Sequence, residues 1–260
     1  MTQTALESLK FRQLVKEEAR VRQQFHIWPQ TTTCLITDDD ESNLGEWLSS
    51  VRARRRLQME TFFLALHLVD CCCLASTKKS TTTTTMAEWG CVCLWVASKQ
   101  TETEPLDMKD IISDSNGVCS SPQQLTGLEL AVLHHAGFQL DIPTAWAFRN
   151  VYHAHNSNQG PDVRSLADYL LLVAAPHNHS RFAAPLLALS SLAAACRLCH
   201  GISESLDTGG EMGRCVATII DQATRYGRQC TPGTLYLAYL ANGEDAERLL
   251  REINCSRHKL

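Results

Sequence analysis

Apolar residues recur along this chain at spacings of three and four positions, which is the period of a helix buried on one side. Runs that alternate strictly between apolar and polar residues, the pattern of a half-buried strand, are almost absent. The chain is therefore expected to be all-α. In its first part the pattern predicts helices over residues 9–24, 44–51, 59–74, 86–99, 106–112 and 122–136.

The segment 86–99 is apolar nearly all round, which is typical of a helix at the centre of a bundle. A run of threonines precedes it, and the threonine hydroxyl competes for backbone groups, so residues 81–85 are expected to form a loop that ends in an N-cap. Residues 29–40, rich in Thr and Asp, predict another loop. The helix over 122–136 opens on Pro122, because proline is favoured in the first turn.

A second series of helices is predicted after Pro143, because proline interrupts a helical pattern. The sequence thus predicts two tandem five-helix domains preceded by an N-terminal helix. We expect the N-terminal helix and linker in residues 1–40, the first domain in 41–141 and the second in 142–260. The helices predicted for the second domain cover residues 144–153, 163–174, 182–199, 212–226 and 232–253.

The net charge argues against a protein that binds nucleic acid. It is −4 at pH 7 over 260 residues, whereas proteins that bind nucleic acid usually carry a basic excess or a basic stripe. No segment is apolar for long enough to cross a bilayer, and the N-terminus lacks the basic and apolar regions of a signal peptide. We expect a soluble intracellular protein that binds neither nucleic acid nor membrane.

The 12 cysteines fall in apolar runs, so we expect reduced, buried thiols rather than disulfides. The strongest candidate for a metal site is Cys196-x-x-Cys199-His200, which follows His177 and His179 in the sequence. A structural zinc site usually brings paired ligands on tight turns, whereas this cluster ends a long helix rich in Ala and Leu. No metal and no cofactor are expected.

Few other groups suggest catalysis. His134, His135, Cys119 and the aspartates at 38–40 are the candidates, and none has a second motif at catalytic or metal-ligand spacing. We therefore do not expect an enzyme.

Four sequence features together resemble a cyclin box. WVASK at 95–99 ends the central helix, ETEPL follows at 102–106, Glu129 precedes an apolar run, and FQLDIPT lies at 138–144. The first predicted domain is then similar to a first cyclin box and the second to a further cyclin fold. The resemblance implies a protein that catalyses nothing itself and acts by reshaping a kinase.

Two further features resemble one branch of that family. The sequence FRQLVKEE at 11–18 and the ETEPL segment are similar to those of D-type cyclins. The Leu-x-Cys-x-Glu sequence with which D-type cyclins bind retinoblastoma-type proteins is missing, and no acidic tail rich in Pro, Ser and Thr follows. In lacking both features, the chain resembles the D-type homologues carried by some gammaherpesviruses.

The resemblance implies a kinase-binding site at Lys99 and Glu129, whose counterparts in the family hydrogen-bond to the kinase backbone beside its regulatory helix. Leu133 and Phe138 fall at apolar positions of the same interface. Taken singly, these residues also fit a simpler interpretation, in which the two charges are solvated on helix surfaces and the two apolar side chains belong to the core.

The resemblance also implies a docking patch. Leu44 and Trp47 match part of the apolar patch with which cyclins recruit substrates bearing Arg-x-Leu. Asp40 and Asn43 stand where that patch has apolar residues, so we expect a degraded site that binds such sequences weakly.

The usual arginine of that stretch has become Glu41, whereas Asp70, which matches its acidic partner, is retained. A buried carboxylate without a partner is costly, so Asp70 needs another donor. A nearby arginine run could supply one, or could serve as a nuclear-import signal. It comprises Arg52, Arg54, Arg55 and Arg56.

Two functions from different classes remain open. The first is a regulatory subunit that binds and activates a cyclin-dependent kinase, of the D-type partner class, in the nucleus and cytoplasm. The second is a cyclin-fold adaptor that binds peptides or transcription machinery without activating a kinase. Retention of both Lys99 and Glu129 favours the first, and the degraded patch leaves room for the second.

Overall fold

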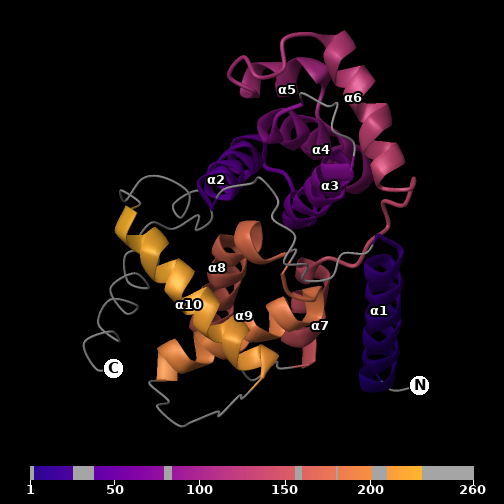
Figure 1. The fold of residues 1–260 in the computed structure, drawn as a ribbon. Helices are drawn as coiled ribbons and strands as arrows, with labels where there is room; N and C mark the ends of the chain where they lie inside the picture. Colours follow the sequence, from indigo (N-terminus) through magenta and orange to yellow (C-terminus); the bar gives the residue numbers. More distant parts are fainter. Residues whose placement is uncertain are drawn as a thin grey trace. The chain divides into compact units, whose positions relative to one another are not determined.

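The computed structural model describes residues 3–25, 38–78, 84–155, 160–179, 181–200 and 210–229. Within these ranges the chain forms helices and no strand, which confirms the all-α prediction (Figure 1). The predicted helix over 232–253 and the predicted loop residues 29–37 and 81–83 lie outside the described residues. The chain divides into two compact units, one of Val15–Trp146 and one of Met1–Leu14 with Ala147–Leu260.

The unit Val15–Trp146 is built around α4 (Met86–Thr101), which is buried at every position from Trp89 to Ser98. The central place expected for the apolar segment 86–99 is thereby confirmed, since four other helices of the unit pack against α4. These are α2 (Asp38–Arg55), α3 (Met59–Lys78), α5 (Met108–Asp114) and α6 (Pro122–His135). Among the described residues, the largest fully buried side chains of this core include Leu48, Phe62, Leu66, Leu94, Ile111 and Leu125.

Local sequence signals explain where α4 and α6 begin. The Thr85 hydroxyl accepts a hydrogen bond from the Glu88 amide, and the Glu88 carboxylate accepts one from the Thr85 amide, so a capping box opens α4 as the threonine run predicts. The Ser121 hydroxyl caps α6 in front of Pro122.

Several predicted boundaries are wrong: the N-terminal helix begins at Gln3 rather than at 9, α3 ends at Lys78 rather than at 74, and the helix predicted over 163–174 is longer at both ends, from Pro161 to Asn178. α5 begins at Met108 rather than at 106, because the Leu106 amide donates to Ser98 Oγ and its carbonyl accepts from Trp95 Nε1. α2 begins at Asp38, so residues 38–40 are helical rather than part of a loop. Aspartates are favourable there because the helix N-terminus carries a partial positive charge.

The other unit contains α8 (Pro161–Asn178), α9 (Ala184–His200) and α10 (Glu211–Gln229), which pack against one another. α7 (Ala145–His155) and α1 (Gln3–Phe25) contribute residues to both units. Within this second unit the Phe11 ring of α1 lies 6.0 Å from that of Phe148 and 5.6 Å from that of Tyr152. Of these three rings Phe148 is fully buried, and burial of such a side chain contributes roughly 1.5–3 kcal/mol to stability.

Candidate functional site

Lys99 and Glu129 form an ion pair at the surface of the unit Val15–Trp146. Lys99 lies in the last turn of α4 and Glu129 in α6, and the lysine Nζ is 2.6 Å from Glu129 Oε1. The two side chains keep 38% and 22% of their area exposed. Because such a pair contributes only about 0–1 kcal/mol to stability, the fold loses little if a partner takes over its contacts.

The Trp95 ring forms the floor under this lysine. Lys99 Nζ lies 3.3 Å from the ring centroid, which is a cation–π contact. The ring itself is 3% exposed, and its Nε1 donates a 3.0 Å hydrogen bond to the Leu106 carbonyl. Trp95 therefore holds Lys99 in place. The sequence signal for this role is an aromatic residue one helical turn before the lysine, a spacing too common to predict the contact by itself.

The chain turns sharply where α6 ends. Gly137 and Phe138 both have a φ of 57°, and the Phe138 amide donates a 2.8 Å hydrogen bond to the Leu133 carbonyl. The left-handed region is uncommon for a bulky residue. The Phe138 ring is 61% exposed and lies 5.0 Å from the ring of His134, so Phe138 is not a core residue.

We name the set Lys99, Glu129, Leu133 and Phe138 the α4–α6 edge. The ion pair joins the two helices, Leu133 follows Glu129 by one helical turn on the same face of α6, and Phe138 closes the end of that helix. Leu133 is half-buried. The structure thus brings together all the residues that the resemblance assigns to a kinase interface.

Leu44 and Trp47 lie on α2 where this helix packs against Gly90 of α4. Gly90 of α4 permits the approach, because a Cβ at that position would overlap Leu44 Cδ1 and lie 3.9 Å from Trp47 Cζ3. Leu44 is 7% exposed and Trp47 is half-buried. Asp40 and Asn43, which precede them on α2, are exposed, so the apolar part of this surface is small.

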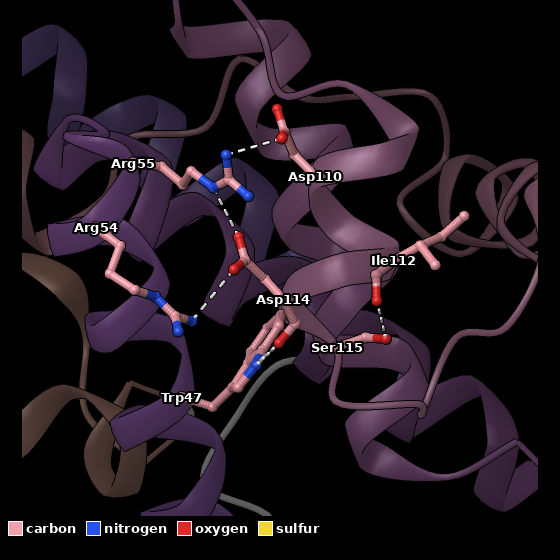
Figure 2. A network of polar contacts seen from close by, with 7 residues as sticks. All are labelled: Trp47, Arg54, Arg55, Asp110, Ile112, Asp114 and Ser115. Atoms are coloured by element: carbon pink, nitrogen blue, oxygen red, sulfur yellow. Dashed lines mark hydrogen bonds and ion pairs between the residues drawn. The ribbon is translucent and has the colours of Figure 1, made fainter.

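A polar network joins this part of α2 to α5 (Figure 2). The Trp47 Nε1 donates a 2.8 Å hydrogen bond to the Asp114 carbonyl, and the Asp114 carboxylate is 2.8 Å from Arg55 Nε and 3.4 Å from Arg54 Nη2. Arg55 also pairs with Asp110 at 2.8 Å. The hydrogen bond to Asp114 raises the pKa of Arg55 although partial burial opposes that shift.

Arg54 and Arg55 pair with the α5 carboxylates. That the run 52–56 supplies a donor for Asp70 stays a prediction. The signal that sequence analysis missed is the spacing of Asp110 and Asp114, which places both carboxylates on one face of α5.

Residues 10–141 match the family model described as "Cyclin, N-terminal domain". This span is more than half of the chain and contains the whole α4–α6 edge. The chain belongs to the cyclin family. Its first predicted domain is therefore a cyclin N-terminal domain, and the resemblance of WVASK and ETEPL to a cyclin box is confirmed.

Two solved structures resemble this cyclin in fold. A viral cyclin from herpesvirus saimiri matches with a TM-score of 0.60 and 17% identity, over 80% of this chain and 96% of that one. A chain in the CAK complex from Chaetomium thermophilum bound to ATP-gamma-S matches with a TM-score of 0.50 and 15% identity, over 97% of this chain and 84% of that one. At this level of identity the likeness concerns the fold.

The cysteines described in this cyclin are thiols, and most are buried. Cys72 Sγ lies 4.0 Å from Cys93 Sγ, and a hydrogen bond from Cys91 to Cys119 together with burial raises the pKa of Cys91. Cys196 of the zinc candidate is half-buried. In the part of the chain that the structure describes, no group of three or more His, Cys, Asp or Glu side chains is arranged to hold a metal.

The described helices also contain no segment of the length and hydropathy that a bilayer crossing requires.

Proposed function

We propose that this cyclin is the regulatory subunit of a cyclin-dependent kinase, which it binds and activates through the α4–α6 edge. The observation that carries the proposal is the ion pair of Lys99 and Glu129 at the surface, with the exposed Phe138 ring at the end of the same helix. Exposed aromatic side chains are enriched in the cores of protein interfaces, and charged hydrogen-bonding groups can fix the register of such an interface.

The chemistry of the edge suits recognition of a helix end or loop of a partner. A lysine ammonium carries three N–H donors, so its pairing with Glu129 leaves donors for backbone carbonyls of the kinase. Leu133 and Phe138 add apolar area beside these polar contacts. Binding at this edge would press the regulatory helix of the kinase inward. That movement would bring the glutamate of the kinase helix to the kinase lysine that holds the ATP phosphates, as an active kinase requires.

We further propose a D-type-like cyclin of gammaherpesvirus type, which acts in the nucleus and cytoplasm of the host cell and has no catalytic activity or cofactor of its own. The sequences FRQLVKEE at 11–18 and ETEPL at 102–106 support the D-type branch. The likeness in fold to a viral cyclin is compatible with this origin.

The test is a double variant, Lys99→Glu with Glu129→Val, assayed for co-purification with a panel of cyclin-dependent kinases. Loss of one partner of an interfacial charged hydrogen bond commonly costs about 2–5 kcal/mol, and the new carboxylate at 99 adds repulsion. We expect kinase binding to be lost. The melting temperature should stay within a few degrees of the parent, because both side chains lie at the surface.

A matched control exists in α1, where Arg20 and Glu17 form another exposed ion pair at 2.9 Å. The variant Arg20→Glu with Glu17→Val should leave kinase binding unchanged. Undiminished binding by a folded Lys99/Glu129 double variant contradicts the proposed interface. If the parent chain itself captures no kinase, the adaptor function is favoured.

A further inference from the structure

The end of α4 is tied to the beginning of α3 by one carboxylate. Glu102, which follows α4 directly, accepts a 2.7 Å hydrogen bond at Oε1 from the Gln58 amide and another at the same oxygen from the Thr61 hydroxyl. Gln58 directly precedes α3 and Thr61 lies in its first turn, so Glu102 caps α3 from the end of another helix. A negative charge is favourable there because the N-terminus of α3 carries a partial positive charge.

Thr101 contributes further polar contacts at the same place. Its carbonyl accepts a 3.2 Å hydrogen bond from Gln58 Nε2, and its hydroxyl oxygen lies 2.7 Å from that of Thr61. Each hydroxyl carries one proton, so Thr101 can donate to Thr61 while Thr61 donates to Glu102. Thr61 is fully buried, whereas Thr101 and Glu102 are half-buried. We name the set Gln58, Thr61, Thr101 and Glu102 the α3–α4 junction.

The α3–α4 junction lies one helical turn from Lys99. Lys99 precedes Glu102 by three residues in the last turn of α4, and its Nζ is 3.3 Å from the centroid of the Trp95 ring. Beyond the junction, the Leu106 amide donates a 3.2 Å hydrogen bond to Ser98 Oγ. The backbone around Lys99 is therefore held at its neighbour Ser98 and again at Glu102.

The position of the Lys99 ammonium depends on how firmly this last turn is held. Helix ends fray, and a lysine side chain has many rotamers, so a loosened turn would allow Lys99 many positions. Ordering these groups only at the moment of binding would cost conformational entropy and lower the affinity for a partner. A contact that fixes the turn in the free chain avoids that cost.

Glu102 itself is directed at α3 rather than at the solvent. Its side chain is half-buried and its Oε1 oxygen is occupied by the Gln58 amide and the Thr61 hydroxyl, whereas residues 103–105 are exposed. A kinase group that bound this oxygen would have to compete with both hydrogen bonds. An effect of Glu102 on kinase binding is therefore expected to pass through Lys99.

We propose that Glu102 is a positioning residue for the kinase interface. Its hydrogen bonds to Gln58 and Thr61 hold the last turn of α4. Lys99 thereby stays over the Trp95 ring. The inference rests on the proposed function for its effect on kinase affinity, and it deepens that function by giving a role to a residue outside the α4–α6 edge.

The first measurement needs no kinase. The Trp95 ring current moves the NMR signals of protons above its face upfield, so the Lys99 εCH2 signal, assigned by its absence from Lys99→Arg, reports the cation–π contact. In Glu102→Ala this signal should move toward those of the other lysines. Thr61→Val, which replaces the donating hydroxyl by a methyl group, should move it in the same direction. Glu102→Gln keeps an accepting oxygen and should leave the signal where the parent has it.

The second measurement is the affinity for the kinase. Glu102→Ala should weaken binding about three- to tenfold, as coupling within one hydrogen-bond network allows, and Glu102→Gln should restore most of this loss. In a Lys99→Ala background, Glu102→Ala should cause no further loss. The matched control is Thr85→Ala, which removes the cap at the opposite end of α4. It should lower the melting temperature but keep the parent's affinity and Lys99 signal.

An unmoved Lys99 signal in Glu102→Ala overturns the proposal, and Thr61→Val decides in the same way if Glu102→Ala does not fold. An equal movement in Thr85→Ala also overturns it, since α4 would then be loosened as a whole. So does an affinity loss that persists in the Lys99→Ala background, because Glu102 would then contact the kinase itself. If the parent binds no kinase, the proposed function fails, and the Lys99 signal alone decides whether Glu102 positions Lys99.

Discussion

An aromatic side chain at a φ of 57° is hard to account for by folding alone. The left-handed region costs a non-glycine residue about 1–2 kcal/mol, because Cβ comes close to the following carbonyl oxygen. At 61% exposure the Phe138 ring recovers little of that energy by burial. Contact with a partner gives a reason for phenylalanine at this position that the free chain does not.

The variant Phe138→Gly should therefore separate stability from binding. Glycine adopts this backbone conformation without strain, so we expect the free energy of unfolding to be unchanged or raised by up to about 1 kcal/mol. Kinase affinity should fall at least about tenfold, because an exposed aromatic anchor is removed. Denaturant unfolding and kinase titration measure the two quantities. A loss of more than about 1 kcal/mol of stability would mean that the ring has a structural role.

At the residue scale, sequence motifs were sufficient to place the residues of the α4–α6 edge but not the contacts that hold them in position. Lys99 and Glu129 could be placed because they sit in recognisable segments of the chain. The cation–π floor under Lys99 and the binding of Arg55 to Asp114 could not, because these contacts join separate helices or depend on the rotamers that packing selects. Two acids one turn apart and a nearby arginine run are common, and only the fold determines which of them meet.

At the scale of helices, boundaries set by side chains close in sequence could be predicted, whereas boundaries set by tertiary contacts could not. The beginnings of α4 and α6 were predictable because Thr85 and Ser121 cap them with side chains close in sequence. The beginning of α5 was not, because Leu106 is held by Ser98 and Trp95 of another helix. Boundaries fixed by caps can be inferred from sequence, whereas those fixed by packing cannot.

Alanine substitutions at two helical glycines test the contact of α2 with α4, because only Gly90 lies at that contact. A Cβ added at Gly127 of α6 would meet nothing within 4 Å, so Gly127→Ala should stabilise the chain by about 0.5–1 kcal/mol through helix propensity. Gly90→Ala should gain less or destabilise, because Leu44 must move. Chemical denaturation of both variants tests the difference, and an equal gain from the two would show that α2 does not rest on Gly90.

At the scale of the whole molecule, the two units contain buried groups that respond to acid in opposite ways. In the unit that begins again at Ala147, burial and then the charges of Arg149 and Arg164 lower the pKa of His153 from 6.5 to about 4. Asp168 lies 4.0 Å from His153 and is itself paired with Arg149. In the unit Val15–Trp146, burial raises the pKa of Glu60 although Thr144 donates a hydrogen bond to it.

Below pH 6.5 the unfolded chain binds a proton at His153 before the folded chain does. The unit with His153 therefore loses stability between pH 6.5 and about 4, by roughly 3 kcal/mol at most. Glu60 has the opposite sign, because its folded form binds a proton first and its unit gains stability as the pH falls.

All 5 tryptophans of the sequence fall within Val15–Trp146. On acidification from pH 7 we therefore expect helical circular dichroism to decrease before tryptophan fluorescence changes. The variant His153→Gln should shift the first transition to lower pH. Simultaneous loss of both signals in parent and variant would contradict the separate response of the two units.

The burial of thiols in both units has a consequence for the lifetime of the molecule. Oxidants and alkylating reagents attack an accessible thiolate, so a sulfur inside a closed helix pair is spared whatever the reagent. Oxidation or alkylation of these thiols then requires the helices to separate transiently, so its rate depends on how often they open. A partner that keeps the helices together would therefore slow the modification of these thiols without contacting any sulfur atom. The buried cysteines concerned are Cys71, Cys72, Cys91, Cys93, Cys119 and Cys215.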